Sequence, residues 1–393
     1  MSKAEGALLR HVHVSGGLTR TQLADRMGVN RSTILAMTAR LAAAGLVHEH
    51  RPADPGRVGR PSLVVAPADR HFVLAFDVAV DRLTAARVAL GGTVTARRTA
   101  PRSRAGADLE VVVAKLTEMG TDLLRELPDD AACVGVGASY CGMIRRADGT
   151  VRYGPDLGWV DQAFGTELGR RLGLGLPVAV GNEAHLGALA EHDRGAGVGV
   201  RNLIYLHGDV GVGGGIIVGD ELLDGDGGYG CELGHMLVDP YDGRPCSCGS
   251  RGCLEAEVGE RALLAAAGRP AELFGRAAVR SVLADAAAGD RRAALAVAEI
   301  GDWLGIGVAN LINLFNPGML IFGGIMSDIY GATAGRVRDR IASNVLPVSR
   351  ERVRLCAAGL GDDSTLLGAA DLAFTDLLAD PLGVARTESL ALR

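Results

Sequence analysis

Aromatic side chains are scarce in this sequence, at 4% of 393 residues, so its cores must be built mainly from Leu, Val and Ala. Cysteines are also few. There are seven, and outside one cluster they lack the spacing of a disulfide framework. Free thiols favour a reducing compartment, and the polar N-terminus lacks the apolar core of a secretion signal. These absences argue against a disulfide-stapled secreted domain, and we expect a cytoplasmic protein.

Long hydrophobic runs are also scarce, and one stretch needs examination. Residues 303–327 carry no formal charge and are numerous enough to span a membrane. However, Asn310, Asn313 and Asn316 interrupt the stretch, and Pro317 follows directly. The pattern therefore predicts a buried helix that ends near Asn316, then a core strand at 319–323, and no membrane partner.

Charge is distributed unevenly along the chain. Residues 1–70 contain ten Lys or Arg and five Asp or Glu, a net charge of +5, whereas the whole chain has −5. The remaining residues therefore carry −10. A basic head on an acidic body favours a nucleic-acid contact that is confined to the head.

The basic head has the pattern of a helix-turn-helix. A first helix is expected at about residues 4–13. Thr19 and Gln22 have the spacing of a capping box, which marks the start of a second helix. Gly28 makes a turn, and Asn30 is suited to cap a third helix. The third helix would bury an apolar stripe that consists of Ile34, Met37, Leu41 and, near its end, Leu46.

The start of the third helix is the part of a helix-turn-helix that reaches base edges in the major groove. Here it presents Arg31, Ser32 and Thr33, with Arg40 further along. Two strands around a basic loop (46–49 and 58–66) would form a wing, and Arg60 could enter a narrow minor groove. We interpret the head as a winged helix-turn-helix that binds double-stranded DNA. The alternative is a small helical domain that only dimerises.

One imidazole and three thiols form the densest chemical cluster in the sequence. They are His235, Cys246, Cys248 and Cys253. This is the ligand set of a closed structural zinc site, and Gly249 and Gly252 supply the tight turns of a chelating loop. The alternatives are redox-active or simply buried thiols. Glu232 and Glu255 bracket the cluster, and the spacing alone leaves open whether they bind anything.

The rest of the chain alternates strands and helices. Strands are expected at 72–77, 83–90, 93–97 and 133–137, with a helix at 107–127, which predicts an α/β fold with a mixed sheet. Two further strands, 203–207 and 216–219, flank a glycine-rich turn at 208–215. No helix follows that turn, so it is not a P-loop. It could cradle an anion, or it could only turn the chain.

The chain resembles the ROK family, named for repressors, open reading frames and sugar kinases. The resemblance covers about residues 1–375 and rests on 232–235 with 246–255, and on 177–184, 208–215 and 322–324. It implies a two-lobed actin/hexokinase-like (ribonuclease H-like) α/β body behind the head. We therefore expect the head at 1–70, a first lobe at 71–185, a second lobe at 186–363, and a C-terminal helix at 364–380 that packs on the first lobe.

The resemblance also implies site residues. Zinc falls to His235, Cys246, Cys248 and Cys253, and sugar contacts fall to Asn182, Glu183, Glu232, His235 and Glu255. Ionised carboxylates suit a sugar because each accepts hydrogen bonds from vicinal hydroxyls. His235 could give one ring nitrogen to zinc and offer the other to a hydroxyl. Members with a winged helix ahead of this body are usually sugar-responsive repressors.

Two departures separate this chain from the kinases of the family. Kinase members follow the first strand with Asp-Xaa-Gly-Gly-Thr, whereas this chain has Val-Ala-Val between Asp77 and Asp81, and the second acid repels phosphate. Kinase members also use an Asp base where this chain has Glu183. A misplacement of about 1 Å can cost about 100-fold in rate. We predict a repressor that binds a sugar without phosphorylating it. The alternative is an ATP-dependent sugar kinase with an added DNA-binding domain.

Two-fold symmetry is common among DNA-binding proteins of this kind. We therefore expect a homodimer or a dimer of dimers on a roughly palindromic operator, which would place the protein at the nucleoid.

Overall fold

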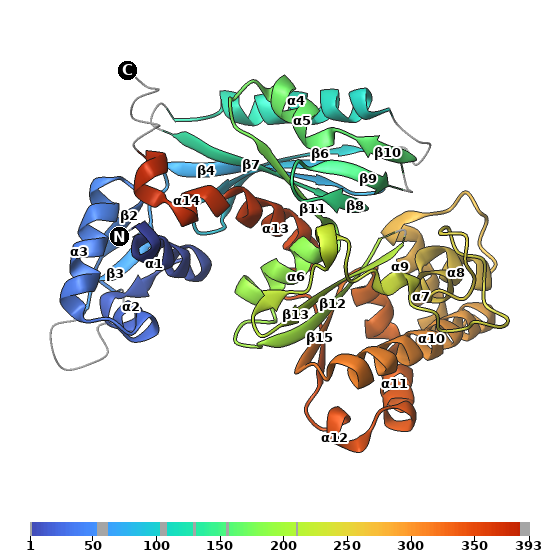
Figure 1. The fold of residues 1–393 in the computed structure, drawn as a ribbon. Helices are drawn as coiled ribbons and strands as arrows, with labels where there is room; N and C mark the ends of the chain where they lie inside the picture. Colours follow the sequence, from blue (N-terminus) through green and yellow to red (C-terminus); the bar gives the residue numbers. More distant parts are fainter. Residues whose placement is uncertain are drawn as a thin grey trace.

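The computed structural model describes residues 2–52, 62–102, 108–128, 131–154, 157–209 and 211–385. A small N-terminal head stands beside two α/β lobes, and the head joins the first of them (Figure 1). Each lobe contains a five-stranded sheet. Two helices, α6 (Glu183–Arg194) and α13 (Ser364–Ala373), lie side by side between the sheets.

The head is a winged helix-turn-helix, as predicted. Its elements are α1 (Ser2–Ser15), β1 (Leu18–Thr19), α2 (Arg20–Met27), α3 (Arg31–Ala43), β2 (Val47–His50) and β3 (Val64–Pro67), with the strands in the order β1-β3-β2. The capping box of Thr19 and Gln22 is present, and the Asn30 side chain caps α3 by accepting from Thr33 N. Ile34, Met37 and Leu41 are fully or almost fully buried, which confirms the predicted stripe.

The first lobe has the strand order β11-β7-β4-β5-β6. The strands are β4 (His71–Val78), β5 (Arg82–Ala89), β6 (Val94–Pro101), β7 (Ala132–Tyr140) and β11 (Val178–Asn182). Side chains of β4 alternate between the two faces, as a strand requires. Phe72, Leu74 and Phe76 pack in the core with α4 (Leu109–Arg125) and α5 (Phe164–Leu172), whereas Val73 and Ala75 pack on the α13 side. A small sheet of β8 (Met143–Arg145), β9 (Thr150–Gly154) and β10 (Trp159–Gln162) extends this lobe.

The second lobe has the strand order β14-β13-β12-β15-β16. The strands are β12 (Asn202–Gly208), β13 (Val212–Val218), β14 (Glu221–Leu222), β15 (Met319–Gly324) and β16 (Arg354–Ala357). Its helices are α7 (Leu254–Val258), α8 (Glu260–Ala266), α9 (Gly275–Ala287), α10 (Arg291–Phe315), α11 (Ile325–Asn344) and α12 (Pro347–Arg350). Short 3-10 turns occupy Asp226–Gly228, Leu233–His235 and Gly361–Asp363.

The long apolar helix that the sequence predicted is α10. By length and composition it could cross a membrane, but 56% of its most apolar window is buried inside the protein. It ends at Asn316, which adopts the left-handed conformation with φ 44°, and β15 follows. Both the end of the helix and the core strand were therefore predicted correctly.

The glycine-rich segment 208–215 differs from its prediction as a turn. Strand β13 already begins at Val212, so Gly213, Gly214 and Gly215 pair with β12 instead of turning. The physical reason is packing, because a Cβ at Gly215 would lie 2.5 Å from the Ala188 methyl of α6. The three glycines therefore admit neighbouring elements.

The head and the first lobe share one hydrophobic core. Leu8, Leu9 and Val12 of α1 belong to the same buried cluster as Val73 of β4 and Phe374 near the C-terminus. α1 contacts α14 (Thr375–Ala379) closely, since a Cβ at Gly6 would lie 2.3 Å from the Leu378 carbonyl oxygen. The head is thus attached to the first lobe by packing as well as by the chain.

Candidate functional site

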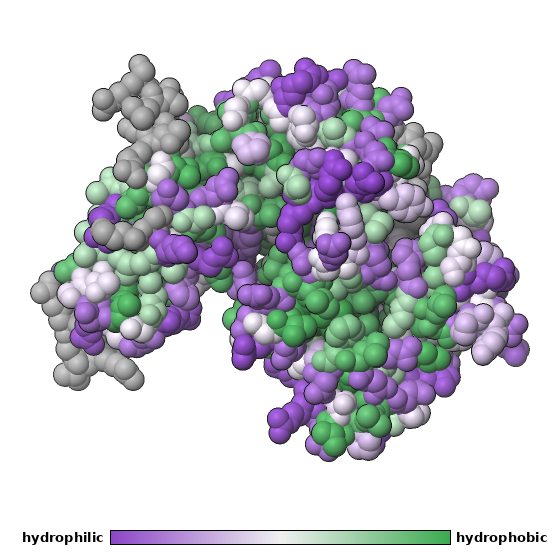
Figure 2. Space-filling model, viewed as in Figure 1, coloured by the Kyte–Doolittle hydropathy of each residue, from purple (hydrophilic) through white to green (hydrophobic). Residues whose placement is uncertain are grey.

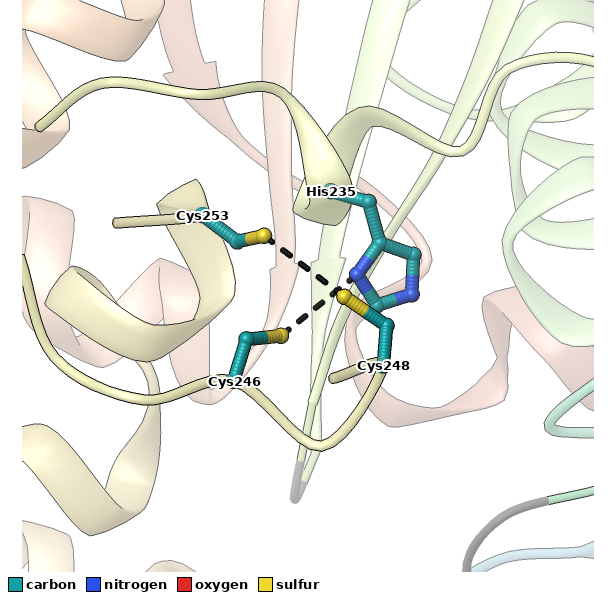
Figure 3. A group of neighbouring side chains, drawn as sticks. All are labelled: His235, Cys246, Cys248 and Cys253. Atoms are coloured by element: carbon teal, nitrogen blue, oxygen red, sulfur yellow. Dashed lines mark hydrogen bonds between the residues drawn. The ribbon is translucent and has the colours of Figure 1, made fainter. Parts of the chain in front are cut away.

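The imidazole and the three thiols of the predicted metal site converge in the second lobe. One ligand atom from each of His235, Cys246, Cys248 and Cys253 lies within 4.8 Å of the others. Cys246 Sγ is 3.6 Å from His235 Nδ1, and Cys248 Sγ is 3.8 Å from Cys253 Sγ (Figure 3). A tetrahedral zinc ion with Zn–S bonds of about 2.3 Å needs S–S edges of about 3.8 Å. The donor set therefore fits zinc in both chemistry and spacing.

The loop that carries these ligands is closed by its backbone. Isolated bridges join Leu237 to Cys253 and Pro245 to Arg251. Gly252 has φ 68°, and a Cβ there would lie 1.7 Å from the Asp239 carbonyl oxygen, so only glycine fits. Cys253 is the N-cap residue of α7, which includes Glu255 two residues later. A metal held by the loop would thus fix the position of Glu255.

The Glu255 carboxylate is held by a backbone amide and a hydroxyl, and Cys246 Sγ lies 3.7 Å from its Oε1. Val212 N–H donates to Oε2 at 3.1 Å, and the Ser247 hydroxyl donates to Oε1 at 3.0 Å. Gly211 leaves room for this approach, because a Cβ there would lie 2.2 Å from Oε2. Sequence reasoning missed the roles of Ser247 and the Val212 amide. Only the position of Ser247 between two ligand cysteines could have suggested its role.

Glu232 lies near the same group of side chains. Although exposed in part, it is surrounded by enough protein that burial raises the pKa of its carboxyl. His235 opposes this rise, and the negative charge of Glu255 adds to it. The two predicted sugar-binding acids therefore lie close enough to sense each other's charge, with His235 nearby.

The other two predicted sugar contacts lie where β11 meets α6. Asn182 Oδ1 caps α6 by accepting from Ala184 N at 2.9 Å and His185 N at 3.1 Å, and Asn182 Nδ2 donates to the Gly142 carbonyl at 3.0 Å. Glu183 is 5% exposed and begins the helix. Asn182 therefore has a structural role that sequence reasoning did not foresee.

Two cavities lie between the lobes. Glu255 lines one of about 450 Å³, together with Val80 and Cys141 of the first lobe and Arg244 and Arg261 of the second. Glu183 lines the other, which measures only about 30 Å³. Of the five predicted sugar residues, only Glu255 lines the larger of these two cavities and only Glu183 lines the smaller. The structure thus brings Glu232, His235 and Glu255 together and leaves Glu183 on the smaller cavity.

The smaller cavity lies at the end of β4 and is filled by charged side chains. Its lining includes Asp77, Asp81, Arg82, Asp209 and Arg276. Arg82 Nη1 lies 3.3 Å from Asp81 Oδ1, and Val80 N–H donates to Asp209 Oδ2 at 3.2 Å. Arg276 pairs with Asp328 and Asp362. A space of about 30 Å³ matches the share of one water molecule in the liquid, not a triphosphate.

Burial changes the titration of this charged group. It raises the pKa of Asp209 to about 6. It also raises the pKa of Asp77, although Arg82 opposes the rise. Burial would lower the pKa of Arg82, but Asp77, Asp209 and Asp81 outweigh it and raise that pKa. Five acidic side chains and two arginines line this cavity, so the arginines offset only part of its negative charge.

The predicted DNA-contact residues lie at different places on the head. Arg31 and Ser32 are exposed at the start of α3, and the hydroxyls of Ser32 and Thr33 both donate to Asn30 Oδ1. Arg40 Nε donates to Glu5 Oε1 at 2.9 Å, so its guanidinium is held against α1. Arg60 lies outside the described residues. A contact between Arg40 and phosphate would have to compete with the Glu5 ion pair.

Comparison with known proteins covers nearly the whole chain. The ROK family pattern matches residues 73–376, and a MarR family pattern matches residues 1–57. The xylose repressor of Caldicellulosiruptor bescii is 28% identical over 376 residues, which is 93% of each chain. This match therefore includes the head as well as the body.

Solved structures give the same result. A ROK family transcriptional regulator, a homologue of the E. coli MLC protein, has a TM-score of 0.78 at 26% identity and covers 98% of both chains. A ROK family glucokinase from Streptomyces griseus, in complex with glucose and AMPPNP, has a TM-score of 0.66 at 28% identity and covers 77% of this chain. The two-lobed hexokinase-like fold is thereby confirmed. The chain belongs to the ROK family, with a MarR-type winged helix-turn-helix ahead of the ROK body.

Proposed function

We propose that this protein is a sugar-responsive transcriptional repressor that binds its effector between the lobes without phosphorylating it. The main supporting observation is that a winged helix-turn-helix head precedes a body in which charged side chains fill the smaller cavity, at the end of β4. We call this the phosphate side, because kinases of the family bind nucleotide phosphates after the first strand. Similarity over the full length to xylose repressors, head included, supports the same function. A pentose such as xylose is therefore the first effector to test.

In this proposal the effector lies against Glu232, His235 and Glu255. Carboxylates that are already oriented by protein donors bind hydroxyls at a lower entropic cost than mobile ones. Asn182, the last residue of β11, and Glu183, the first residue of α6, complete the proposed set. A ligand that touches both lobes and prefers one angle between them can change DNA affinity only through that preference.

Zinc would be held by His235 Nδ1 and the thiolates of Cys246, Cys248 and Cys253. When bound, it supplies structural cross-linking of the loop and takes no part in a reaction. The Nε2 atom of His235 then remains for a sugar hydroxyl. The His235 ring is oriented by its ligand bond, just as Glu255 is oriented by Val212 and Ser247.

The head would bind an operator through the start of α3, with Arg31, Ser32 and Thr33 facing the major groove. A dimer would place two heads on a roughly palindromic site at the cytoplasmic nucleoid. Arg31→Ala should weaken DNA binding and reduce the slope of log affinity against log salt by about one, since one phosphate or base-edge cation is lost. An unchanged salt slope would remove Arg31 from the interface.

The direct test is a titration of the full-length protein with DNA from its own upstream region, with and without sugars. We expect a panel of pentoses and hexoses to contain a compound that changes DNA affinity at least about fivefold, the lower end of typical allosteric coupling. No effect from any sugar that binds would contradict the proposal. Glucokinase similarity favours a sugar kinase as the second candidate, and an ADP-release assay in the same samples separates the two.

A further inference from the structure

A buried polar cluster joins the head to the body at one point. Its members are His13 of α1, Arg194 at the end of α6, Asp371 of α13, and Gly91 between β5 and β6. Arg194 Nε lies 3.0 Å from Asp371 Oδ2, and Arg194 Nη2 lies 2.7 Å from Oδ1. Arg194 Nη1 donates to the carbonyl oxygens of His13 at 2.9 Å and Gly91 at 3.1 Å. The Arg194 side chain is only 8% exposed.

Hydrogen bonds in this cluster fix its orientation. Gly91 N–H donates to His13 Nδ1 at 2.9 Å, while His13 Nε2 lies 2.9 Å from Asp371 Oδ1 and 2.5 Å from Arg194 Nη2. Arg194 also meets the last carbonyls of α1, where a helix leaves acceptors unpaired and its dipole favours a cation. One guanidinium therefore holds the first helix of the head and helix α13 together.

The helix that carries Arg194 is packed on the second lobe. Methyl groups of Ala184 and Ala188 fill the space over Gly213 and Gly215 of β13, at 3.0 Å and 2.5 Å from the positions of a Cβ. α6 packs just as closely on α13, where a Cβ at Gly368 would lie 2.2 Å from the Leu186 carbonyl oxygen, so α6 is wedged between β13 and α13. The opposite end of the same helix begins at Glu183, beside the cavities between the lobes.

The partners of Arg194 belong instead to the first lobe. α13 packs on β7, where a Cβ at Gly137 would lie 2.0 Å from the Ala369 carbonyl oxygen. The head is packed on this lobe too, through the shared core of α1. Elsewhere, open space separates the head from most of the second lobe (Figure 2). Arg194 thus lies at the end of a helix that packs on both lobes, and its side chain is inserted between α1 and α13.

We propose that Arg194 is a positioning residue that transmits the angle between the lobes to the DNA-binding head. This inference rests on the proposed function, because it needs a sugar that changes that angle. When α6 shifts along α13, the Arg194 guanidinium must either lose its hydrogen bonds to Asp371 or displace the end of α1. A planar guanidinium that makes two parallel hydrogen bonds has few intermediate positions, so the contact is engaged or released.

The test is the ratio of DNA dissociation constants with and without saturating sugar, measured on the full chain. Typical allosteric ratios are about 5- to 150-fold, and Arg194→Gln should bring the ratio to within about twofold of one while sugar affinity stays unchanged. Arg194→Lys, which keeps the charge without the fork, should retain part of the response. Arg201→Gln is the matched control, since Arg201 pairs with Asp220 within the second lobe.

The outcomes separate the two proposals. A wild-type protein that binds sugar with no change in DNA affinity would contradict the proposed function. If sugar changes the DNA affinity of the wild type and of Arg194→Gln by the same ratio, the inference about Arg194 is wrong but the proposed function stands. Equal losses of sugar and DNA affinity would also overturn it, because they indicate a structural role. If Arg194→Gln does not fold, the same ratio of DNA dissociation constants is measured for Arg194→Lys and Asp371→Asn. Wild-type ratios in both variants would contradict the proposal.

Discussion

The two cavities between the lobes differ in the side chains that line them. On the side of the metal loop, Glu255 lines a cavity of about 450 Å³ together with Cys246 and Ser247, and backbone and hydroxyl donors orient its carboxylate. On the side of β4, Asp77 and Asp209 face arginines around about 30 Å³. The metal-loop side offers hydrogen-bond acceptors to a neutral polyhydroxy ligand. On the β4 side, the arginines are already paired with acidic side chains of the protein.

Under the proposed function, the difference explains how a kinase-like fold would sense a sugar without phosphorylating it. A sugar needs oriented acceptors, which the metal loop supplies through local geometry. Nucleotide phosphates need close backbone N–H groups and a positive electrostatic potential. Buried acids at that position make the potential more negative and repel phosphate. In the proposed function, phosphate binding can be lost while sugar binding is kept, because different segments build the two sides. The following predictions would break or sharpen this comparison, beginning with the largest effect.

Removing one thiol should damage the sugar side most. Cys248→Ser should lose most of the bound zinc and weaken sugar affinity by at least about tenfold, in keeping with the large free energy of structural zinc sites. DNA affinity without sugar should stay within about twofold. Metal analysis and a sugar titration measure both effects. Cys356→Ser, in β16 away from the loop, is the control and should change neither.

Neutralising one oriented acid should weaken sugar binding more than removing one of its donors. Glu255→Gln loses charge-assisted hydrogen bonds that are worth about 1.5–3 kcal/mol, or about 10- to 150-fold in affinity. Ser247→Ala removes only a donor to Oε1 and should cost about 0.5–1.5 kcal/mol. Calorimetric titration measures both. Equal affinity for wild type and Glu255→Gln would remove Glu255 from the sugar site.

Asp209 on the phosphate side should make the stability of the protein depend on pH. Asp209 has a folded pKa of about 6, above its unfolded value, so the folded state binds the extra proton and stability rises as pH falls through 6. Between pH 7 and pH 5 the gain is about 1 kcal/mol.

Asp209→Asn should abolish that gain in urea unfolding, whereas the surface variant Asp220→Asn should keep it. The pKa of Asp220 is lowered by its Arg201 partner, so its contribution changes only in more acidic solution. A pH dependence that is the same in wild type and Asp209→Asn would show that Asp209 is not the group that titrates.

Nucleotide should produce the smallest effect. Magnesium ATP should shift the thermal unfolding midpoint by less than about 1 °C, because a ligand stabilises only in proportion to its occupancy. Glu183→Asp should leave this result unchanged, since the base is not the only departure. A shift of several degrees that disappears in Arg82→Gln would place nucleotide at the charged cluster and remove the contrast between the two sides.

Local features of the fold were predictable from the sequence. The capping box at Thr19, the cap at Asn30 and the helix end at Asn316 each depend on neighbouring residues, and all three are present. The Cys₃His set could be recognised because chelation needs short spacing within one loop, and its four members converge. The winged helix-turn-helix and the two-lobed body follow from such signals together with the family resemblance.

Features that depend on distant packing were not predictable. Gly213 to Gly215 suggested a turn, but they form a strand because α6 packs against it. Arg40 looked available for DNA, but it pairs with Glu5, 35 positions away. The Val212 amide that holds Glu255 lies 43 positions away, and Arg194 meets His13 across 181. No local pattern encodes such contacts, since they form only when the lobes and the head assemble.

The most direct measurement incubates the zinc-loaded protein with magnesium ATP and the sugar that it binds most tightly, and follows the sugar by mass spectrometry. We predict saturable sugar binding with no phosphorylated product after many hours at micromolar protein. Multiple turnovers to a sugar phosphate would contradict the claim that this cleft recognises its ligand and leaves it unchanged.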